Sequence, residues 1–118
     1  MNPLNYCTQP YAQKLHDAGI VIKTDYGWAE LPNYYVAKDG SYPLEWRLVD
    51  KPHSHYKHPL PAPCFVEVWR ELPERAQIKK YLNRSVCEYN NHCFENTNPT
   101  DAAIELLVWV KGREYERN

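Results

Sequence analysis

Glycine, methionine and long apolar runs are scarce in this sequence. The 118 residues include 4 glycines and 1 methionine but 10 prolines, so we expect stiff connections between secondary-structure elements. No stretch approaches the ~20 consecutive apolar residues that a transmembrane helix needs, so we expect no membrane partner. Residues 1–5 carry neither a basic patch nor an apolar run, so we expect no signal peptide, a cytoplasmic location and reduced cysteines.

A basic surface is lacking as well. The formal net charge is −1, with 14 Lys and Arg interleaved among 15 Asp and Glu. Proteins that bind nucleic acid usually carry a basic stripe that displaces counterions from phosphates, so we expect no nucleic-acid partner. The chain contains no phosphate-binding loop, nucleophile elbow, HExxH or dinucleotide fingerprint, and no motif therefore indicates catalysis.

Large aromatic side chains, by contrast, are abundant. The sequence has 10 tyrosines and 4 tryptophans, which predict a core or a surface built from rings. The length suits a single domain, 1–118, and the 43% hydrophobic and 25% charged residues are ordinary for a folded domain.

The clearest secondary-structure signal is the segment 98–110. Asn98 suits the N-cap, because its side-chain oxygen can accept an unpaired backbone N–H of the first turn. Pro99 suits the first helical position, and Asp101 places negative charge near the positive end of the helix dipole. Apolar residues then repeat at helical spacing, namely Ala103, Leu106, Leu107 and Val110. The pattern predicts a buried helix, followed by a frayed charged tail at 112–118.

Two shorter helices are predicted upstream. Thr8 is a candidate cap for a helix that ends at Gly19, a residue suited to the left-handed conformation beyond a helix C-terminus. Residues 63–72 carry apolar side chains at helical spacing, and Pro63 and Pro73 bracket this second helix.

Two segments have the pattern of antiparallel strands. Within 26–49, an Asp-Gly pair at 39–40 is a hairpin signal, and Pro32 indicates an edge strand or a break. The segment 76–95 predicts a three-stranded meander with turn residues between its strands.

A two-residue turn at Asn90 and Asn91 would fix the register of the last two strands, because Asn tolerates the positive φ of tight turns. The pairs that would share one face are Tyr89 with His92 and Cys87 with Phe94. Ile78, Leu82 and Val86 would then fill the other side of the sheet.

Together these elements predict an α+β fold, in which about three helices pack mainly on one face of an antiparallel sheet of about 4–6 strands. The residues expected in the core are Leu15, Trp28, Trp46, Phe65, Val68, Trp69, Leu72, Phe94, Ile104, Leu107 and Val108. The Pro- and His-rich segment 51–63 is predicted to be an exposed loop or an extended strap across the sheet.

This Pro/His-rich loop is the sharpest candidate for chemistry. His53, His55 and His58 are close enough in sequence to bind Zn²⁺ or a similar ion. Against this interpretation, Lys57 in the same loop would repel a cation, and metal sites usually gather their ligands from several rigid elements. A solvated polar loop is the simpler alternative.

Tyrosines of the strand region and of the loop form the second candidate. Tyr34, Tyr35, Tyr42 and Tyr56 would bind a protein partner if they form an exposed patch. If helices cover the sheet instead, such rings belong to the core.

Two weaker clusters have simple structural explanations. His92, Cys93 and Glu95 include a nucleophile and bases, but neighbouring strand residues point to opposite faces. Asp101 and Glu105 are spaced to share a cation, although a helix-terminal charge and a solvent-facing side chain explain them more simply.

The C-terminal half contains a combination of three motifs: Pro-Ala-Pro at 61–63, Val-Trp-Arg-Glu-Leu-Pro at 68–73, and the capped apolar pattern at 94–109. This combination resembles small uncharacterised proteins encoded by phages and prophages of Bacteroides-type bacteria. Residues 64–66 and the Pro/His-rich loop depart from the family pattern. The resemblance implies origin and architecture, and it implies no catalytic residues.

We therefore expect a non-enzymatic accessory or protein-interaction module of phage or prophage type, acting in the cytoplasm of a bacterial host cell. It would bind a protein through an uncovered sheet face or through the Pro/His-rich loop. One alternative is a metal-binding protein that uses His53, His55 and His58, with Zn²⁺ as the one cofactor considered. The other alternative is a small enzyme with an unrecognised site.

Overall fold

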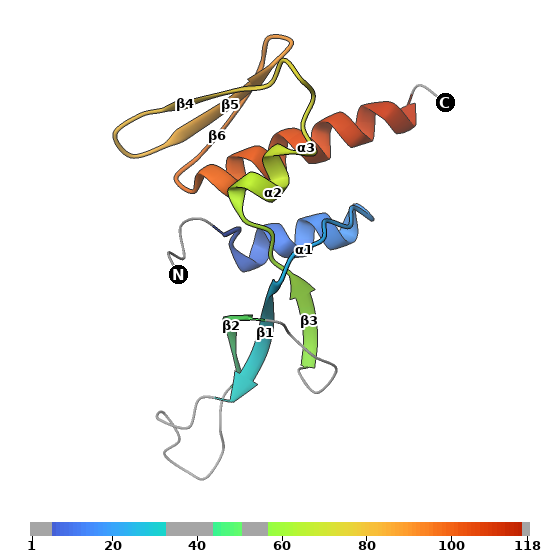
Figure 1. The fold of residues 1–118 in the computed structure, drawn as a ribbon, viewed down its shortest axis with the longest axis vertical. Helices are drawn as coiled ribbons and strands as arrows, with labels where there is room; N and C mark the ends of the chain where they lie inside the picture. Colours follow the sequence, from blue (N-terminus) through green and yellow to red (C-terminus); the bar gives the residue numbers. More distant parts are fainter. Residues whose placement is uncertain (1–5, 33–43, 51–56, 117–118) are drawn as a thin grey trace.

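A computed structural model of the chain describes residues 6–32, 44–50 and 57–116. Figure 1 shows three helices lying between two small antiparallel sheets, in an elongated molecule that measures 53 × 37 × 21 Å. The predicted α+β class is confirmed, but the strands form two three-stranded sheets instead of one. Within the described ranges, no helix has the length and apolar character needed to cross a bilayer.

The first sheet has the strand order β2-β1-β3. Its strands are β1 (Tyr26–Pro32), β2 (Leu44–Asp50) and β3 (Lys57–Pro61). β1 is central and antiparallel to both neighbours, with Trp28 opposite Leu48 on one side and Leu60 on the other. Pro32 therefore ends a central strand and does not mark an edge strand, a position that proline tolerates because the ladder stops there.

Strand β3 lies within the segment 51–63, which was predicted to be an exposed loop or an extended strap, so 57–61 is extended chain paired at the sheet edge and not loop. Its edge position explains how a strand accommodates Pro59 and Pro61, because β3 has a partner on one side only and some of its N–H groups need none. The rest of the Pro/His-rich loop, at 51–56, and the predicted hairpin turn at 39–40 lie outside the described residues.

The second sheet is the meander predicted for 76–95, with the strand order β4-β5-β6. Its strands are β4 (Gln77–Lys80), β5 (Ser85–Tyr89) and β6 (His92–Asn96). Asn90 and Asn91 have φ angles of 49° and 66° and form the predicted two-residue turn. Tyr89 pairs with His92 and Cys87 with Phe94, so the predicted register is confirmed.

One part of the meander prediction is wrong. Ile78 lies directly opposite Cys87 and so shares its face of the sheet. Leu82 lies in the turn between β4 and β5, where its side chain is fully exposed. The alternation of apolar and polar residues that places side chains on one face of a strand holds only within the strand. Residues 81–84 form a turn, so the alternation does not extend to Leu82.

Helix α3 (Pro99–Glu116) is the longest element and begins as predicted. The side-chain oxygen of Asn98 accepts the backbone N–H groups of Thr100 and Asp101, at 2.8 and 3.2 Å. The helix continues to residue 116 and so includes most of the segment 112–118, for which a frayed tail was predicted.

Helices α1 (Gln9–Asp17) and α2 (Phe65–Trp69) also lie where they were predicted, but α2 is shorter than 63–72. The backbone N–H of Cys64 donates to Glu67 Oε1 at 2.9 Å and so fixes the first turn of α2. Thr8 occupies the N-cap of α1, yet its side chain makes no capping bond. Gly19 follows α1 with a φ of +71°, as predicted.

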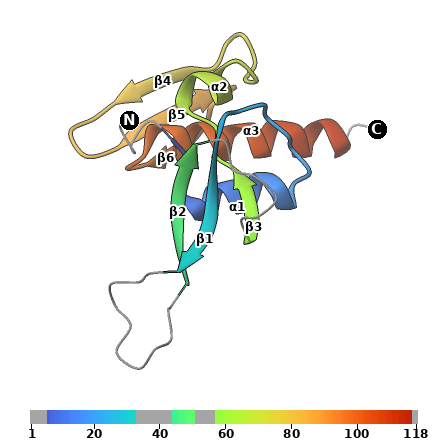
Figure 2. The same cartoon turned by 60° about the horizontal axis from the view of Figure 1, so that its bottom comes forward.

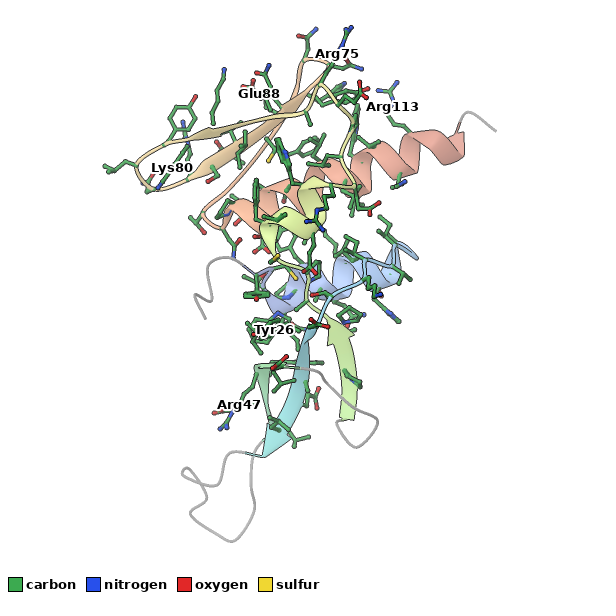
Figure 3. The ribbon with its side chains drawn as sticks, viewed as in Figure 1. Tyr26, Arg47, Arg75, Lys80, Glu88 and Arg113 are labelled. Carbon is green, nitrogen blue, oxygen red and sulfur yellow. The ribbon has the colours of Figure 1, made fainter. Side chains whose placement is uncertain are left out.

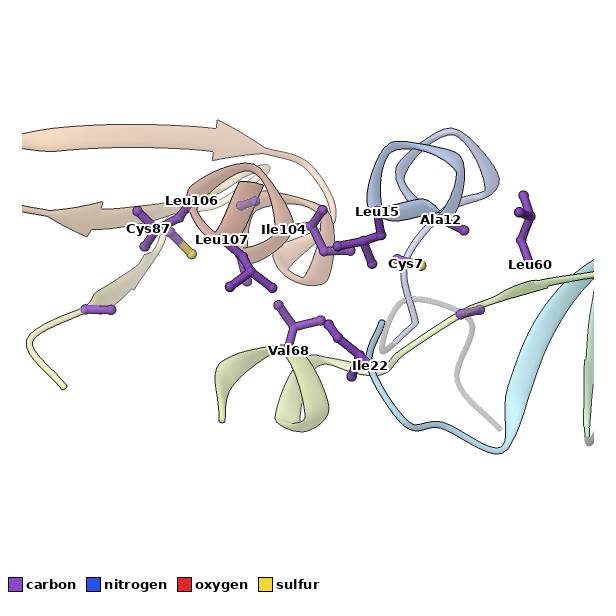
Figure 4. Close-up of a cluster of buried hydrophobic side chains, with 14 residues drawn as sticks. Cys7, Ala12, Leu15, Ile22, Leu60, Val68, Cys87, Ile104, Leu106 and Leu107 are labelled. Atoms are coloured by element: carbon purple, nitrogen blue, oxygen red, sulfur yellow. The ribbon is translucent and has the colours of Figure 1, made fainter. Parts of the chain in front are cut away.

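The hydrophobic core lies where the three helices meet (Figure 4). Among the predicted core residues, Leu15, Val68, Ile104 and Leu107 are buried. The others pack half-buried around this cluster, namely Trp28, Trp46, Phe65, Trp69, Leu72, Phe94 and Val108. The centre of the core is therefore aliphatic, and large rings cover its margins. Ala102 and Ala103 are completely buried in α3, and their small side chains let neighbouring elements approach the helix closely.

Candidate functional site

Most residues predicted to bind a metal or a partner lie outside the described residues. These are His53, His55, Tyr34, Tyr35, Tyr42 and Tyr56. His58 lies in β3. In the part of the chain that is described, no group of three or more His, Cys, Asp or Glu side chains is placed to hold a metal ion. The metal and tyrosine sites therefore stay predictions.

The face alternation predicted for His92 and Cys93 is confirmed. His92 lies opposite Tyr89, and its ring contacts Trp109 of α3 with 4.2 Å between ring centroids. Cys93 lies opposite Glu88 on the outer face of the sheet and is exposed. The imidazole and the thiol therefore point away from each other and do not form a nucleophile–base pair.

Asp101 is buried, so its interpretation as a simple helix-terminal charge is incomplete. Its side chain is 2% exposed and accepts two hydrogen bonds from Thr8, one from the backbone N–H at 2.9 Å and one from the hydroxyl at 2.7 Å. Burial raises the pKa of Asp101 above its ordinary value, and the two hydrogen bonds from Thr8 oppose this rise. Because the Thr8 hydroxyl is engaged by Asp101, it does not cap α1.

Glu105 is also wrongly predicted, since it is half-buried and not solvent-facing. It accepts a hydrogen bond from the Tyr11 hydroxyl, which in turn accepts one from Asn96 Nδ2 at 2.9 Å. Burial and the hydrogen bond to Glu105 raise the pKa of Tyr11 to about 12, so the phenol keeps its proton at neutral pH. We call Thr8, Tyr11, Asn96, Asp101 and Glu105 the helix-junction network.

The helix-junction network connects α1, the end of β6 and the first half of α3. In the described residues, every buried side-chain nitrogen and oxygen has a hydrogen-bond partner, so the network leaves no buried donor or acceptor aimed at a ligand. Two buried thiols lie near its charges. Burial raises the pKa of Cys7 to about 12 and that of Cys87 to about 11, which keeps both thiols protonated and weakly nucleophilic. The geometry assigns this region to holding the helices together.

An apolar groove lies beside the connection between α1 and β1. Two adjoining cavities, of about 220 and 520 Å³, share Gly19, Ile20 and Val21 in their walls. The larger cavity is completed by Ala18, Glu71, Val108, Lys111 and Gly112. Figures 1 and 2 show this connection beside the C-terminal half of α3. We call the two cavities together the Val21 groove, because Val21 is 88% exposed within it.

The wall of the Val21 groove is held rigidly on the α1 side. The N–H of Gly19 donates to the carbonyl of His16, and the N–H of Ile20 donates to the carbonyl of Leu15, both at 3.0 Å. This pair of bonds is a Schellman motif, which ties the residues after a helix to its last turn. The backbone is therefore tied to α1 as far as Ile20, the residue before Val21.

The outer face of the second sheet carries charged side chains in two ion pairs. Lys79 pairs with Glu88 at 3.4 Å and Arg84 pairs with Glu95 at 3.5 Å, so the charges of this face partly neutralise one another. An exposed ring is found at the turn between β4 and β5, where Tyr81 is 45% exposed.

The Val21 groove was not predicted from the sequence, although residues 20–22 carry one indication of an outward-facing apolar side chain. Ile20, Val21 and Ile22 are three consecutive β-branched residues, a composition that favours extended chain. Alternate side chains of an extended chain point to opposite sides, so one of them had to face away from the core. Ile22 is buried at 6% exposure and Val21 faces outward.

The site thus rests on the geometry of this chain alone. The phage-type resemblance of the C-terminal half remains an expectation, and it supplies no binding residues. Comparison of the chain with protein-family models, with curated proteins and with solved structures found no match.

Proposed function

We propose that this protein is a protein-interaction module that holds an apolar segment of a partner protein in the Val21 groove. The observation that carries the proposal is the 88% exposure of Val21 beside a cavity of about 520 Å³. Exposing a large aliphatic side chain to water is unfavourable, and a partner that covers it would gain hydrophobic stabilisation. The accessory role of phage or prophage type, in a bacterial cytoplasm, is part of this proposal.

The chemistry of the lining favours a peptide segment as the ligand. Ile20, Val21 and Val108 offer aliphatic surface, whereas Glu71 and Lys111 place one charge of each sign at the larger cavity. A lining without net charge suits an uncharged, aliphatic stretch of chain, and it gives no preference for phosphate or for a metal ion. The protein needs no catalytic group for such a role, because apolar contacts and a few rim hydrogen bonds suffice for recognition.

The proposal can be tested by selecting peptides from a displayed library on the immobilised wild-type protein. Affinities of the selected peptides are then measured by fluorescence anisotropy with four variants. Val21→Asp puts a charge into the groove, and Gly112→Trp fills it. A Cβ atom at Gly112 would meet nothing within 4 Å, so the backbone position admits a side chain, and Gly112 lines the larger cavity. We expect both variants to bind at least about tenfold more weakly, as for loss of an interface anchor.

Two matched controls separate groove effects from general effects. Val66→Asp introduces the same charge at another exposed valine, 54% exposed in the first turn of α2 and outside the groove. Gly112→Ala changes the same helix position with little added volume. Both controls should bind the peptides within about twofold of wild type. The proposal fails if the library yields no binder, or if the selected peptides bind Val21→Asp and Gly112→Trp as tightly as wild type.

A further inference from the structure

The turn between β4 and β5 projects beyond the rest of the second sheet. The last residue of β6, Asn96, pairs with Ser85, so β6 does not extend beside the turn residues 81–84 (Figure 1). The N–H of Tyr81 donates to the carbonyl of Arg84 at 2.8 Å and closes the turn tightly. We call residues 79–84 the hairpin tip.

The hairpin tip combines an exposed aliphatic side chain, a ring and three cations. Leu82 is fully exposed at the turn, and Tyr81 is 45% exposed beside it. The cations are Lys79, Lys80 and Arg84, and Figure 3 shows Lys80 at this end of the sheet. Residues 79–84 contain no carboxylate. The tip therefore carries positive charge around an apolar apex.

The acidic partners of these cations lie on β5 and β6, behind the turn residues 81–84. Lys79 pairs with Glu88 in the body of the sheet, and Arg84 pairs with Glu95. Lys79, Arg84 and Glu95 are each at least half exposed in these pairs, where ion pairs contribute little and can exchange partners. An anionic surface that approaches the tip therefore competes with Glu88 and Glu95 for Lys79 and Arg84.

We propose that the hairpin tip binds the surface of an anionic lipid bilayer. Leu82 would enter the boundary between headgroups and acyl chains, Tyr81 would lie at headgroup level, and the three cations would contact anionic headgroups. This proposal departs from the expectation of no membrane partner, which rested on the lack of a spanning segment.

Two other kinds of partner fit the tip less well. Single-stranded nucleic acid binds by stacking bases on free aromatic faces, but the Arg84 guanidinium lies 5.0 Å from the centroid of the Tyr81 ring and covers one face. A folded protein partner usually buries about 800 Å² on each side, whereas the tip offers one leucine and one tyrosine on a convex turn. A bilayer needs no matching shape, so a small convex apex is sufficient for it.

The test is sedimentation of the full chain with sucrose-loaded vesicles. One set contains only phosphatidylcholine, and the other contains about 30% phosphatidylserine, which supplies the negative surface potential. We expect sedimentation with the anionic set that is weak, reversible and abolished by high salt. Leu82→Ser should lower the partition coefficient about tenfold, because a buried leucine is lost. Lys80→Gln should lower it about fivefold, because one charge near the surface is lost.

Matched controls remove charge or apolar area elsewhere on the protein. Lys23→Gln and Val66→Ser change an exposed cation and an exposed valine outside the tip, and both should sediment like wild type. Thermal melts of all variants should coincide with wild type, because the replaced side chains lie outside the core. Val21→Asp should also sediment normally, since the Val21 groove plays no part.

Several results would overturn the bilayer proposal. Failure of wild type to sediment with anionic vesicles, or equal sedimentation with both vesicle sets, would contradict it. Equal losses of binding in the tip variants and the control variants would contradict it as well. Tip-dependent binding to a single-stranded oligonucleotide without vesicle binding would assign the tip to nucleic acid. None of these results bears on peptide binding in the Val21 groove.

Discussion

Replacing Thr8 with valine tests the role of the helix-junction network in stability. Valine keeps the shape of threonine but removes the hydroxyl that donates to Asp101 at 2.7 Å. A hydrogen bond to a charged group contributes about 1.5–3 kcal/mol, and Asp101 at 2% exposure has little access to replacement water, so we expect a loss of about 2 kcal/mol. The entropy of unfolding for a chain of this size is about 0.25 kcal/mol/K, so Tm should fall by about 8 °C.

The loss should depend on pH in a defined direction. Burial raises the pKa of Asp101, so the folded state holds this proton more tightly than the unfolded state does. Asp101 therefore contributes stability that is complete below its ordinary pKa of 3.8 and is lost as pH rises through the raised folded pKa. The Thr8 bonds lower that pKa, and valine removes one of them. The deficit of Thr8→Val should thus be larger at about pH 7 than at about pH 4.

The assay is urea unfolding followed by tryptophan fluorescence at both pH values. Thr8→Ser restores a hydroxyl and should recover most of the stability. In an Asp101→Asn background the Thr8→Val loss should shrink to about 1 kcal/mol, since the acceptor is then neutral. A Thr8→Val protein within about 0.5 kcal/mol of wild type at about pH 7 would refute the reasoning, as would an equal deficit at both pH values.

Three further predictions concern other parts of the molecule. Leu107→Ala, at a completely buried position, should lower the free energy of unfolding by about 3 kcal/mol, whereas Leu82→Ala should change it by less than about 0.5 kcal/mol. Comparable losses for the two variants in urea titrations would contradict the burial pattern. Gly112→Ala should raise Tm and increase the free energy of unfolding by up to about 1 kcal/mol, because Gly112 lies within α3 and an added Cβ meets open space. A lower Tm would show that the folded state needs glycine at this position. The raised pKa of Tyr11 contributes stability that is present below its ordinary pKa of 10.0 and is lost as pH rises toward about 12. Tyr11→Phe should therefore abolish this part of the decline in Tm at alkaline pH. An unchanged decline would exclude Tyr11 as its source.

The parts of the fold that sequence predicted correctly are those specified by neighbouring residues. The start of α3 follows from Asn98 and Pro99, which act within one turn of the helix. The β5–β6 register follows from Asn90 and Asn91, because a two-residue turn fixes every pair beyond it. Such signals require no knowledge of the rest of the chain, so hydrophobic period and capping chemistry are sufficient to predict them.

The parts that sequence did not predict depend on contacts between distant residues. Thr8 and Asp101 are separated by 93 residues, and neither alone indicates a partner, so Thr8 was assigned to a cap and Asp101 to the helix dipole. The division into two sheets likewise depends on β1 taking β2 and β3 as neighbours, which strand patterns do not specify. The exposure of Leu82 was not predicted because an apolar residue in a strand-like pattern is assigned to the inside of a sheet by default.

The two proposed surfaces and the helix-junction network are connected through α3. The network fixes α1 against the first half of α3, while the second half of α3 forms one wall of the Val21 groove. The opposite wall is the segment at Gly19 and Val21, which the Schellman motif ties to the end of α1. The width of the groove is therefore set by how α1 lies on α3. The buried network, which does not line the groove, would then matter for binding because it positions the two walls before any partner arrives. Preorganised walls lower the entropic cost of binding.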